Sequence, residues 1–252
     1  CLPDYDGHID WAFGIVDAPY IWDGAKLSSA LPKAIWELQV YDSCVEHDQL
    51  GQLVLGWGLA NYRFDRYRDK TKTPLNQLKY PQTISVSRLN GLLTGTYLCR
   101  DLINLPSNHL TPAELETAAQ QLAATHQATI TTHRGDQLAA AFPAIHAVGR
   151  AAEIGPRLID MRWGDSGPKI TLIGKGITFD SGGLDLKPSK AMEMMKKDMG
   201  GAATVLGLAT ALMTSGAKIQ LRVLIATAEN AVSDRAMRPL DVIDTRAGIK
   251  VE

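Results

Sequence analysis

Cysteine is scarce in this sequence, whose 252 residues include only Cys1, Cys44 and Cys99. These three are odd in number and far apart, and no Cys-x-x-Cys pair occurs. The pattern therefore predicts neither a disulfide framework nor a structural zinc site. Sparse cysteine of this kind is typical of a reducing compartment, so we expect a cytoplasmic protein. The alternative, a reactive thiol, has no obvious activating neighbour in the sequence.

Long apolar runs and an excess of one charge are also missing. No stretch approaches the roughly 20 apolar residues that a membrane-spanning helix needs. The first residues, Cys-Leu-Pro-Asp-Tyr-Asp, lack the apolar core of a signal peptide. Lys and Arg number 26 against 27 Asp and Glu, which gives a formal net charge of −1. We therefore expect neither a membrane nor a nucleic acid as a partner.

An initiator Met is absent as well, and Gly248-Ile-Lys-Val-Glu252 at the other end alternates like a strand that is just beginning. We therefore expect a sequence that is truncated at both ends. The length suffices for one large domain, or for one domain with a smaller one. Apolar residues make up 45% and charged residues 21%, as in an ordinary globular protein.

The first third of the sequence is rich in aromatic residues. We expect residues 1–80 to hold part of a small amino-terminal α/β domain and a connector, with the polar stretch 66–72 in the connector. A domain core explains the aromatic residues better than the alternative, a ligand-binding aromatic surface. They are Tyr5, Trp11, Phe13, Tyr20, Trp22, Trp36, Tyr41, Trp57, Tyr62, Phe64 and Tyr67.

Helical patterns begin after this part. Between residues 85 and 105 apolar residues recur at intervals of three or four, so we expect a linker helix over residues 81–105. A second helix should start at Thr111, because Pro112 suits the first helical position and Glu114 completes a capping box.

Residues 106–252 are expected to form an α/β domain. Strands alternate there with helices, which predicts a mostly parallel sheet with helices on both faces. The expected strands are 128–132, 158–163, 169–173 and 219–226, and the expected helices are 111–125, 137–141 and 200–214.

Four charged residues lie at or beyond the end of the strand 170–173, namely Lys175, Asp180, Lys187 and Asp198. In open α/β sheets ligands bind outside the carboxyl ends of strands, so Lys175 and Asp180 are expected at the functional edge. Taken singly, each residue has a plainer explanation, because aspartates often cap turns and lysines are usually solvated.

Two other kinds of site fit the same stretch poorly. A phosphate-binding loop needs a Ser or Thr directly after its Lys, whereas Gly176 follows Lys175. A serine nucleophile at Ser181 lacks the Gly-x-Ser-x-Gly pattern, and no His occurs from position 147 onward to act as its base. What remains is a cluster of carboxylates and amines, which suits Mg²⁺, Mn²⁺ or Zn²⁺. Two such ions can share a bridging carboxylate and activate a water molecule.

Three stretches closely resemble the leucyl (cytosol) aminopeptidase family of two-metal exopeptidases. They are Ile173-Gly-Lys-Gly-Ile-Thr-Phe-Asp-Ser-Gly-Gly183, Leu186-Lys-Pro-Ser189 and Met192-Glu-Met-Met-Lys-Lys-Asp-Met-Gly-Gly-Ala-Ala203. The resemblance extends back through Arg100–Pro112 and forward through Ala228-Glu-Asn230 and Arg238–Val242. It is weaker at 57–65, and nothing before about residue 50 aligns.

The resemblance implies a role for each residue. Lys175, Asp180 and Asp198 are similar to ligands of two divalent ions (Mn, Zn or Mg), with Asp180 bridging both. Lys187 is similar to the catalytic lysine that polarises the substrate carbonyl, and Met195 to a residue lining the pocket for the first substrate side chain. The implied activity is removal of N-terminal, leucine-like residues from peptides, by an enzyme that forms hexamers.

The family supplies a further Asp, a Glu and an Arg from a segment that would follow Glu252. We therefore expect the 252 residues alone to bind metal weakly and to turn over little substrate. The alternative is a catalytically incomplete fragment or homologue with a binding, regulatory or assembly role. Four charges gathered at one strand edge favour the enzyme over that alternative.

Overall fold

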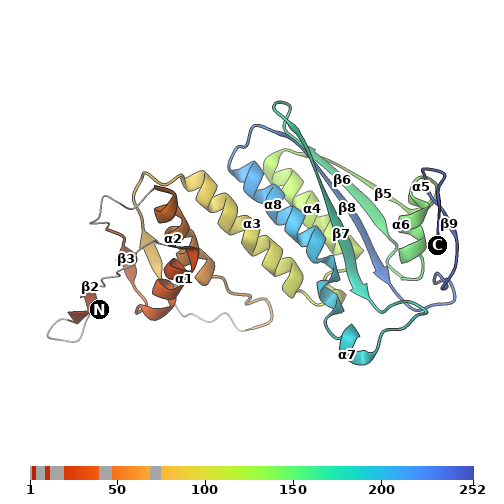
Figure 1. Cartoon of the computed structure of the whole chain (residues 1–252), viewed down its shortest axis with the longest axis horizontal. Coiled ribbons are helices and arrows are strands. Elements are labelled where there is room, and N and C mark those ends of the chain that lie inside the picture. The colour runs from red at the N-terminus through yellow and green to blue at the C-terminus, as the bar shows by residue number, and fades with distance from the viewer. Residues whose placement is uncertain (1, 4–8, 12–19, 40–46, 69–74) are drawn as a thin grey trace. The chain divides into compact units, whose positions relative to one another are not determined.

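The structure is a computed structural model that describes residues 2–3, 9–11, 20–39, 47–68 and 75–252. The chain divides into two compact units, Cys1–Leu93 and Thr94–Glu252 (Figure 1). Several residues singled out in the sequence lie outside the described part: Cys1, Tyr5, Phe13, Tyr41, Cys44, the side chain of Trp11 and residues 69–72 of the connector. No helix in the described ranges is both long enough and apolar enough to cross a membrane.

The first unit packs two helices backbone to backbone. At Gly24 and Gly56 an added Cβ would lie only 1.8 Å and 1.6 Å from carbonyl oxygens of the facing helix. Buried Asn76 joins these helices to the strands, because its side chain donates to Ser28 and Leu31 and accepts from the Ala34 amide. The described elements are β1 (Leu2–Pro3) antiparallel to β2 (Ile9–Trp11), α1 (Ile21–Ala30), α2 (His47–Ala60), and β3 (Ile35–Glu37) parallel to β4 (Gln77–Lys79).

The aromatic core expected for this unit forms only in part. Trp57 is 4% exposed and its indole donates to the Asn76 carbonyl at 3.1 Å. The prediction is wrong for Tyr20, Trp22 and Tyr67, which are at least 50% exposed. Where α1 and α2 meet at Gly24 and Gly56, the close backbones leave no room between them for the rings of Tyr20 and Trp22. Aliphatic side chains such as Val54, Ile84 and Leu89 fill the core instead.

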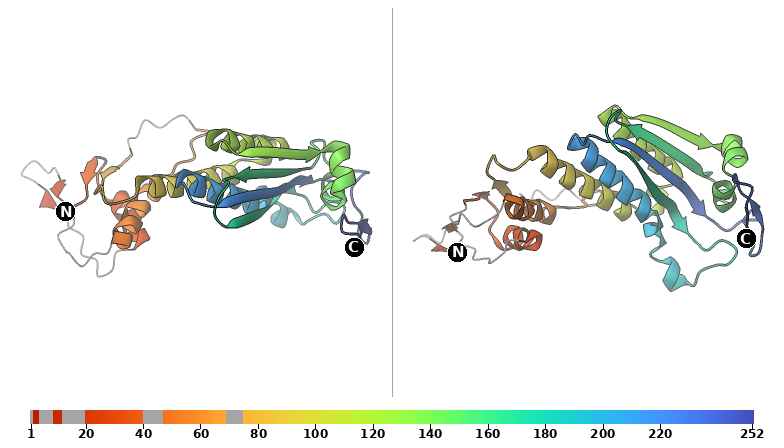
Figure 2. Two further views of the ribbon diagram at one scale, coloured as in Figure 1. Left: turned by 90° about the horizontal axis from the view of Figure 1, so that it is seen from above. Right: turned by 45° about the horizontal axis from the view of Figure 1, so that its top comes forward.

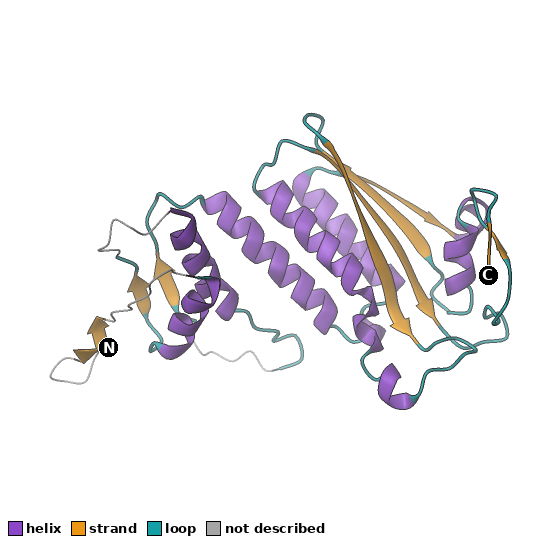
Figure 3. Cartoon of the chain, in the orientation of Figure 1, coloured by secondary structure: helices purple, strands orange, loops and turns teal. Residues whose placement is uncertain are grey.

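The second unit contains the long helices and the main sheet (Figure 3). The expected capping box at Thr111 is confirmed, since Thr111 accepts from Ala113 and Glu114 accepts from the Thr111 amide. The expected domain boundaries at residues 80 and 105 stay predictions.

The helices are α3 (Val86–Asn104), which runs across the division between the units, η1 (Ser107–His109), α4 (Pro112–His126), α5 (Gly135–Ala141), α6 (Pro143–Gly149), α7 (Ser189–Met192), η2 (Met195–Met199) and α8 (Gly200–Thr214). The strands are β5 (Thr129–Arg134), β6 (Arg157–Trp163), β7 (Lys169–Asp180), β8 (Gln220–Asn230), β9 (Ile243–Asp244) and β10 (Lys250–Val251).

The α/β class is confirmed, but the expected mostly parallel pairing is wrong for the main sheet. The strand order is β5-β6-β8-β7, and only β7 and β8 are parallel. β6 is antiparallel to both β5 and β8. The reason is the short connection between β6 and β7, where Gly164 and Gly167 at φ 78° and 83° reverse the chain direction. A short loop of this kind leaves no helical crossover, so β6 and β7 run in opposite directions. β8 lies between them, parallel to β7 and therefore antiparallel to β6.

Helices lie against both faces of this sheet. On one face α4 and α8 cover Ile159, Val223 and Ile225, which are at most 1% exposed (Figure 2). The other face is contacted by α5 and α6 near one end, where the Phe142 ring lies 5.2 Å from that of His133. Beyond this contact the second face is open, and Ile173 is 75% exposed.

Candidate metal centre

β7 is longer than its sequence suggests. The expected strand ended before Gly174-Lys175-Gly176, but β7 continues to Asp180. The glycines serve packing here: an added Cβ on Gly174 would lie 2.8 Å from Cα of Ala202 in α8. Lys175 therefore lies within the strand, and only Asp180 lies at its end.

A β-bulge brings Lys175 and Asp180 to the same face of the sheet. These residues are five apart, an odd number, so regular alternation would direct them to opposite faces. The register shifts between Ile177 and Asp180, and the β8 partners of Lys175 and Asp180 are Ala226 and Asn230. Because these partners are an even number of residues apart, both side chains leave the same face.

Lys175 pairs with Asp198 of η2, which packs against β7. Nζ of Lys175 lies 2.9 Å from Oδ2 of Asp198, and the side chains are 61% and 16% exposed. Despite this distance Oδ2 is buried and has no hydrogen-bond partner among the described residues, so the ammonium approaches it at a poor angle. Gly201 permits α8 to pack closely against β7 here, since an added Cβ would lie 3.1 Å from the backbone nitrogen of Lys175.

Asp180 is held by three groups. Its Oδ1 accepts from the Gly182 amide at 2.9 Å and from Nδ2 of Asn230 at 2.8 Å, while its Oδ2 lies 3.1 Å from Nζ of Lys187. Burial alone would raise the pKa of Asp180, but these hydrogen bonds and the Lys187 charge together lower it below its usual value. The carboxylate is therefore kept charged.

The loop after β7 fixes Lys187 beside this carboxylate. Gly182 and Gly183 turn the chain at φ 92° and 69°, and the Lys187 amide donates to the Ser181 carbonyl at 2.9 Å. The Lys187 side chain is 30% exposed. The four predicted charged residues are thus brought together two by two, Lys175 with Asp198 and Lys187 with Asp180.

Two residues near the site, Met195 and Asn230, were predicted less fully from the sequence. Met195 begins η2, three residues before Asp198, and is partly buried, so its role in a substrate pocket stays a prediction. Asn230 received no role from the sequence, although its amide contacts Asp180. The only feature that points to Asn230 is the pairing of β7 with β8, which no local sequence pattern encodes.

The donor atoms suit a hard divalent cation. The set consists of two partly buried carboxylates, one of which contains the orphaned Oδ2 of Asp198, and two amines. Within the described ranges no three His, Cys, Asp or Glu residues gather as a metal cluster. The described residues therefore provide two carboxylates and the Lys175 amine toward such a site.

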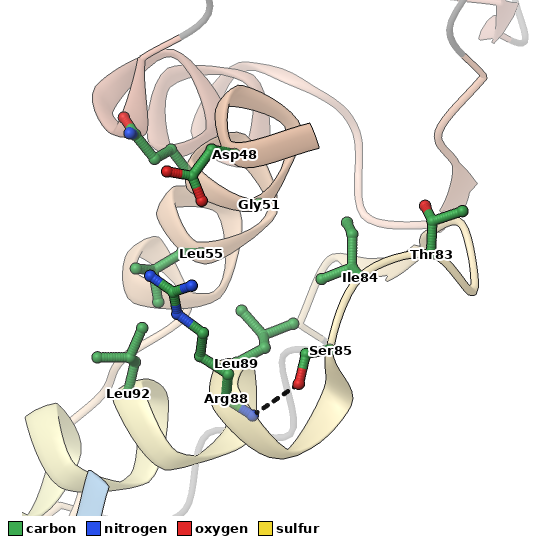
Figure 4. A pocket seen from close by; sticks show the side chains of 10 residues that line it. Asp48, Gly51, Leu55, Thr83, Ile84, Ser85, Arg88, Leu89 and Leu92 are labelled. Atoms are coloured by element: carbon green, nitrogen blue, oxygen red, sulfur yellow. Dashed lines mark hydrogen bonds between the residues drawn. The ribbon is translucent and has the colours of Figure 1, made fainter. Parts of the chain in front are cut away.

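Two hollows lie elsewhere. In the first unit, a hollow of about 210 Å³ lies between α2 and the start of α3, with Leu55 and Leu89 in its apolar lining and Asp48 and Arg88 at its edge (Figure 4). In the second unit a hollow of about 600 Å³ reaches Leu184, in the loop that carries Lys187, and is lined by polar residues including Arg150 and Arg235. Neither contains a pair of carboxylates comparable to Asp180 and Asp198.

Comparison with known proteins gives a consistent result. Residues 97–252 match the model of the cytosol aminopeptidase family, catalytic domain, and residues 1–81 match the M17 aminopeptidase N-terminal domain. A probable cytosol aminopeptidase of Geobacter sp. is 33% identical over 242 residues, which is 90% of this chain and 46% of the relative.

Two solved structures are similar to this chain over essentially its whole length. The crystal structure of cytosol aminopeptidase from Coxiella burnetii has a TM-score of 0.91 at 42% identity, and covers 100% of this chain and 55% of its own. The bottromycin maturation enzyme BotP in complex with Mn has a TM-score of 0.85 at 30% identity, over 99% of this chain and 57% of its own. The chain thus spans about half the length of the relatives it matches.

Proposed function

Because the chain belongs to the cytosol aminopeptidase family, we propose that the protein is a metal-dependent aminopeptidase. Its substrates are peptides with a free N-terminus, and leucine-like first residues are preferred. The observation that carries the proposal is the placement of Lys175 and Asp180 on one face of β7 by a bulge. Each is paired with an opposite charge, Asp198 or Lys187, from the segment between β7 and α8.

We assign Lys175, Asp180 and Asp198 to holding two divalent ions, Mn²⁺, Zn²⁺ or Mg²⁺. Supporting this, Oδ2 of Asp198 is buried without a hydrogen bond from any described residue, and the only described partner of Oδ2 of Asp180 is Lys187. Carboxylate oxygens and a neutral amine are suitable donors for these ions. The solved BotP complex contains Mn, which favours Mn²⁺ as the first ion to test. When bound, the two ions would supply Lewis-acid activation of a water molecule at neutral pH.

Lys187 is assigned to the substrate carbonyl. Its ammonium is held beside Asp180 and is partly exposed, so it can donate to the oxygen of the first peptide bond. A fixed positive charge stabilises the negative charge that develops on this oxygen during hydrolysis. Met195 is assigned to the pocket for the first side chain. A substrate with a free amino group distinguishes this exopeptidase chemistry from cleavage inside a peptide.

We further propose a cytoplasmic homo-oligomer, a hexamer by its resemblance to the family. Relatives named cytosol aminopeptidases support the compartment. A purely regulatory or structural role is less well supported, because it gives no reason for two partly buried carboxylates to pair with two lysines beside β7.

Calorimetric titration with Mn²⁺ tests the metal assignment. Asp180→Asn and Asp198→Asn should each weaken binding at least about tenfold, because each removes a charged donor. Asp160→Asn is the matched control, since Asp160 is a partly buried carboxylate of the same sheet that pairs with Arg222 instead. We expect this control to bind Mn²⁺ as the wild type does. The titration uses the whole protein, and a whole wild-type protein that takes up no Mn²⁺, Zn²⁺ or Mg²⁺, or three variants with equal affinity, would contradict the proposal.

A further inference from the structure

Asn230 ends β8 directly opposite Asp180. The strand register pairs Asp180 with Asn230 just beyond the bulge, where β7 advances three residues while β8 advances two. Thr178 stabilises the bulge, because its hydroxyl donates to the Ala228 carbonyl at 3.3 Å. Bulges next to active sites commonly redirect a side chain. Here the redirected carboxylate of Asp180 meets the amide of Asn230.

One residue thereby contacts both Asp180 and the loop that carries Lys187. Nδ2 of Asn230 donates to Oδ1 of Asp180 at 2.8 Å. The carbonyl oxygen of Asn230 accepts from the amide of Ser181 at 3.0 Å and from its hydroxyl at 2.6 Å. Ser181 in turn accepts from the amides of Gly183 and Lys187. Asn230 therefore anchors the carboxylate with its side chain and the Lys187 loop with its backbone.

The loop is shaped around the Asn230 side chain. An added Cβ on Gly183 would lie 2.9 Å from Oδ1 of Asn230, and Gly183 has φ 69°. Glycine is therefore required on both steric and conformational grounds. The side chain of Asn230 is thus enclosed between Asp180 on one side and Gly183 on the other.

We infer that Asn230 is a positioning residue that holds Asp180 in the orientation needed for metal binding; this rests on the proposed function of Asp180. A neutral amide is suited to this task, because it orients Oδ1 by hydrogen bonding without cancelling the negative charge. Oδ2 is thereby turned toward Lys187. Hydrogen-bond partners of metal-binding carboxylates typically contribute about 10–100-fold to metal affinity.

The alternative is that Asn230 only closes the end of the strand pair. The backbone contacts to Ser181 serve that purpose and persist in any Asn230 variant. Removal of the side chain therefore separates the two roles. A structural role would change stability, whereas a positioning role would also change metal affinity and the order of the 181–187 loop.

The test variant is Asn230→Ala and the control variant is Arg222→Ala. The control removes the ion pair between Arg222 and Asp160. Arg222 lies on β8, as Asn230 does, but well away from it in sequence. Mn²⁺ affinity is measured by calorimetry, and hydrogen exchange of residues 181–187 by mass spectrometry without metal. We expect Asn230→Ala to bind Mn²⁺ about 10–100-fold more weakly. We also expect faster exchange in the loop, because the released carboxylate of Asp180 holds the Gly182 amide and Lys187. Arg222→Ala should match the wild type in both.

Unchanged Mn²⁺ affinity in Asn230→Ala would overturn the inference, even if the loop exchanged faster. The exchange measurement needs no metal, so it tests the contact between Asn230 and Asp180 separately if the wild type binds no Mn²⁺. In that event the proposed function is contradicted, and equal loop exchange in Asn230→Ala and Arg222→Ala would also overturn the role of Asn230.

Discussion

Oδ2 of Asp198 lies 2.9 Å from Nζ of Lys175, yet it accepts no hydrogen bond from the part of the chain that the structure describes. A buried carboxylate oxygen is normally satisfied by a well-aligned donor, because desolvation without a partner costs free energy. At this position the nearest cation is close but badly aligned. The arrangement suits an oxygen that a metal ion would share with the Lys175 amine.

The Lys175–Asp198 pair predicts that metal binding releases a proton. Only the neutral amine of Lys175 can act as a ligand, so its ammonium must lose a proton when the ion binds. We expect Mn²⁺ binding to release about one proton more from the wild type than from Lys175→Met. The count is obtained by calorimetry in buffers of different ionisation enthalpy. Lys169→Met, at the exposed start of β7, should behave as the wild type, and equal counts in all three would contradict the ligand role.

Lys187 should affect the reaction rate more than metal binding. In the whole protein, Lys187→Met should lower kcat on L-leucine p-nitroanilide by about 10²–10³-fold, because the developing oxyanion loses its donor. Mn²⁺ affinity should change far less. Lys190→Met on α7 is the control, and N-acetyl-leucine p-nitroanilide should not be hydrolysed by any form. Full activity in Lys187→Met would exclude the assigned role.

The ion pair between Asp160 and Arg222 should make the stability of the second unit fall in acid. The hydrogen bond from Arg222 is the main reason that the pKa of Asp160 is lowered from its usual 3.8. A carboxyl group whose folded pKa is lowered stabilises the fold above the unfolded pKa, and this contribution is lost as the pH falls through the folded pKa. Urea unfolding at pH 7 and pH 3 should therefore show a smaller acid loss in Asp160→Asn than in the wild type. An identical pH dependence would show that the pair does not contribute.

The contact between α3 and α8 should not tolerate a larger residue. An added Cβ on Gly95 would lie 2.2 Å from the carbonyl oxygen of Gly207. Gly95→Ala should destabilise the second unit by about 1–3 kcal/mol, because the two helix backbones must move apart. Gly155→Ala is the matched control, since an added Cβ there meets nothing within 4 Å. Thermal unfolding measures both, and equal midpoints would contradict the prediction.

Local patterns predicted four of the helices, although α2 (His47–Ala60) and α6 (Pro143–Gly149) were not expected. The helix expected over 200–214 is observed as Gly200–Thr214, and the capping box at Thr111 forms as expected. These features depend on residues a few positions apart, which the sequence displays directly. Strand direction in the main sheet was predicted wrongly, because the alternation of strands and helices does not reveal that β8 lies between β6 and β7.

The sequence by itself determined which residues form the candidate site, since Lys175, Asp180, Lys187 and Asp198 stand in motifs that need no structure to be read. Only the tertiary structure decided which of these residues contact one another. Lys175 pairs with Asp198 and Lys187 with Asp180, and Asn230 supports Asp180 from 50 residues away. The reason is the bulge in β7: it changes the face from which Asp180 projects, and it is defined by pairing with β8, a partner that is distant in the chain.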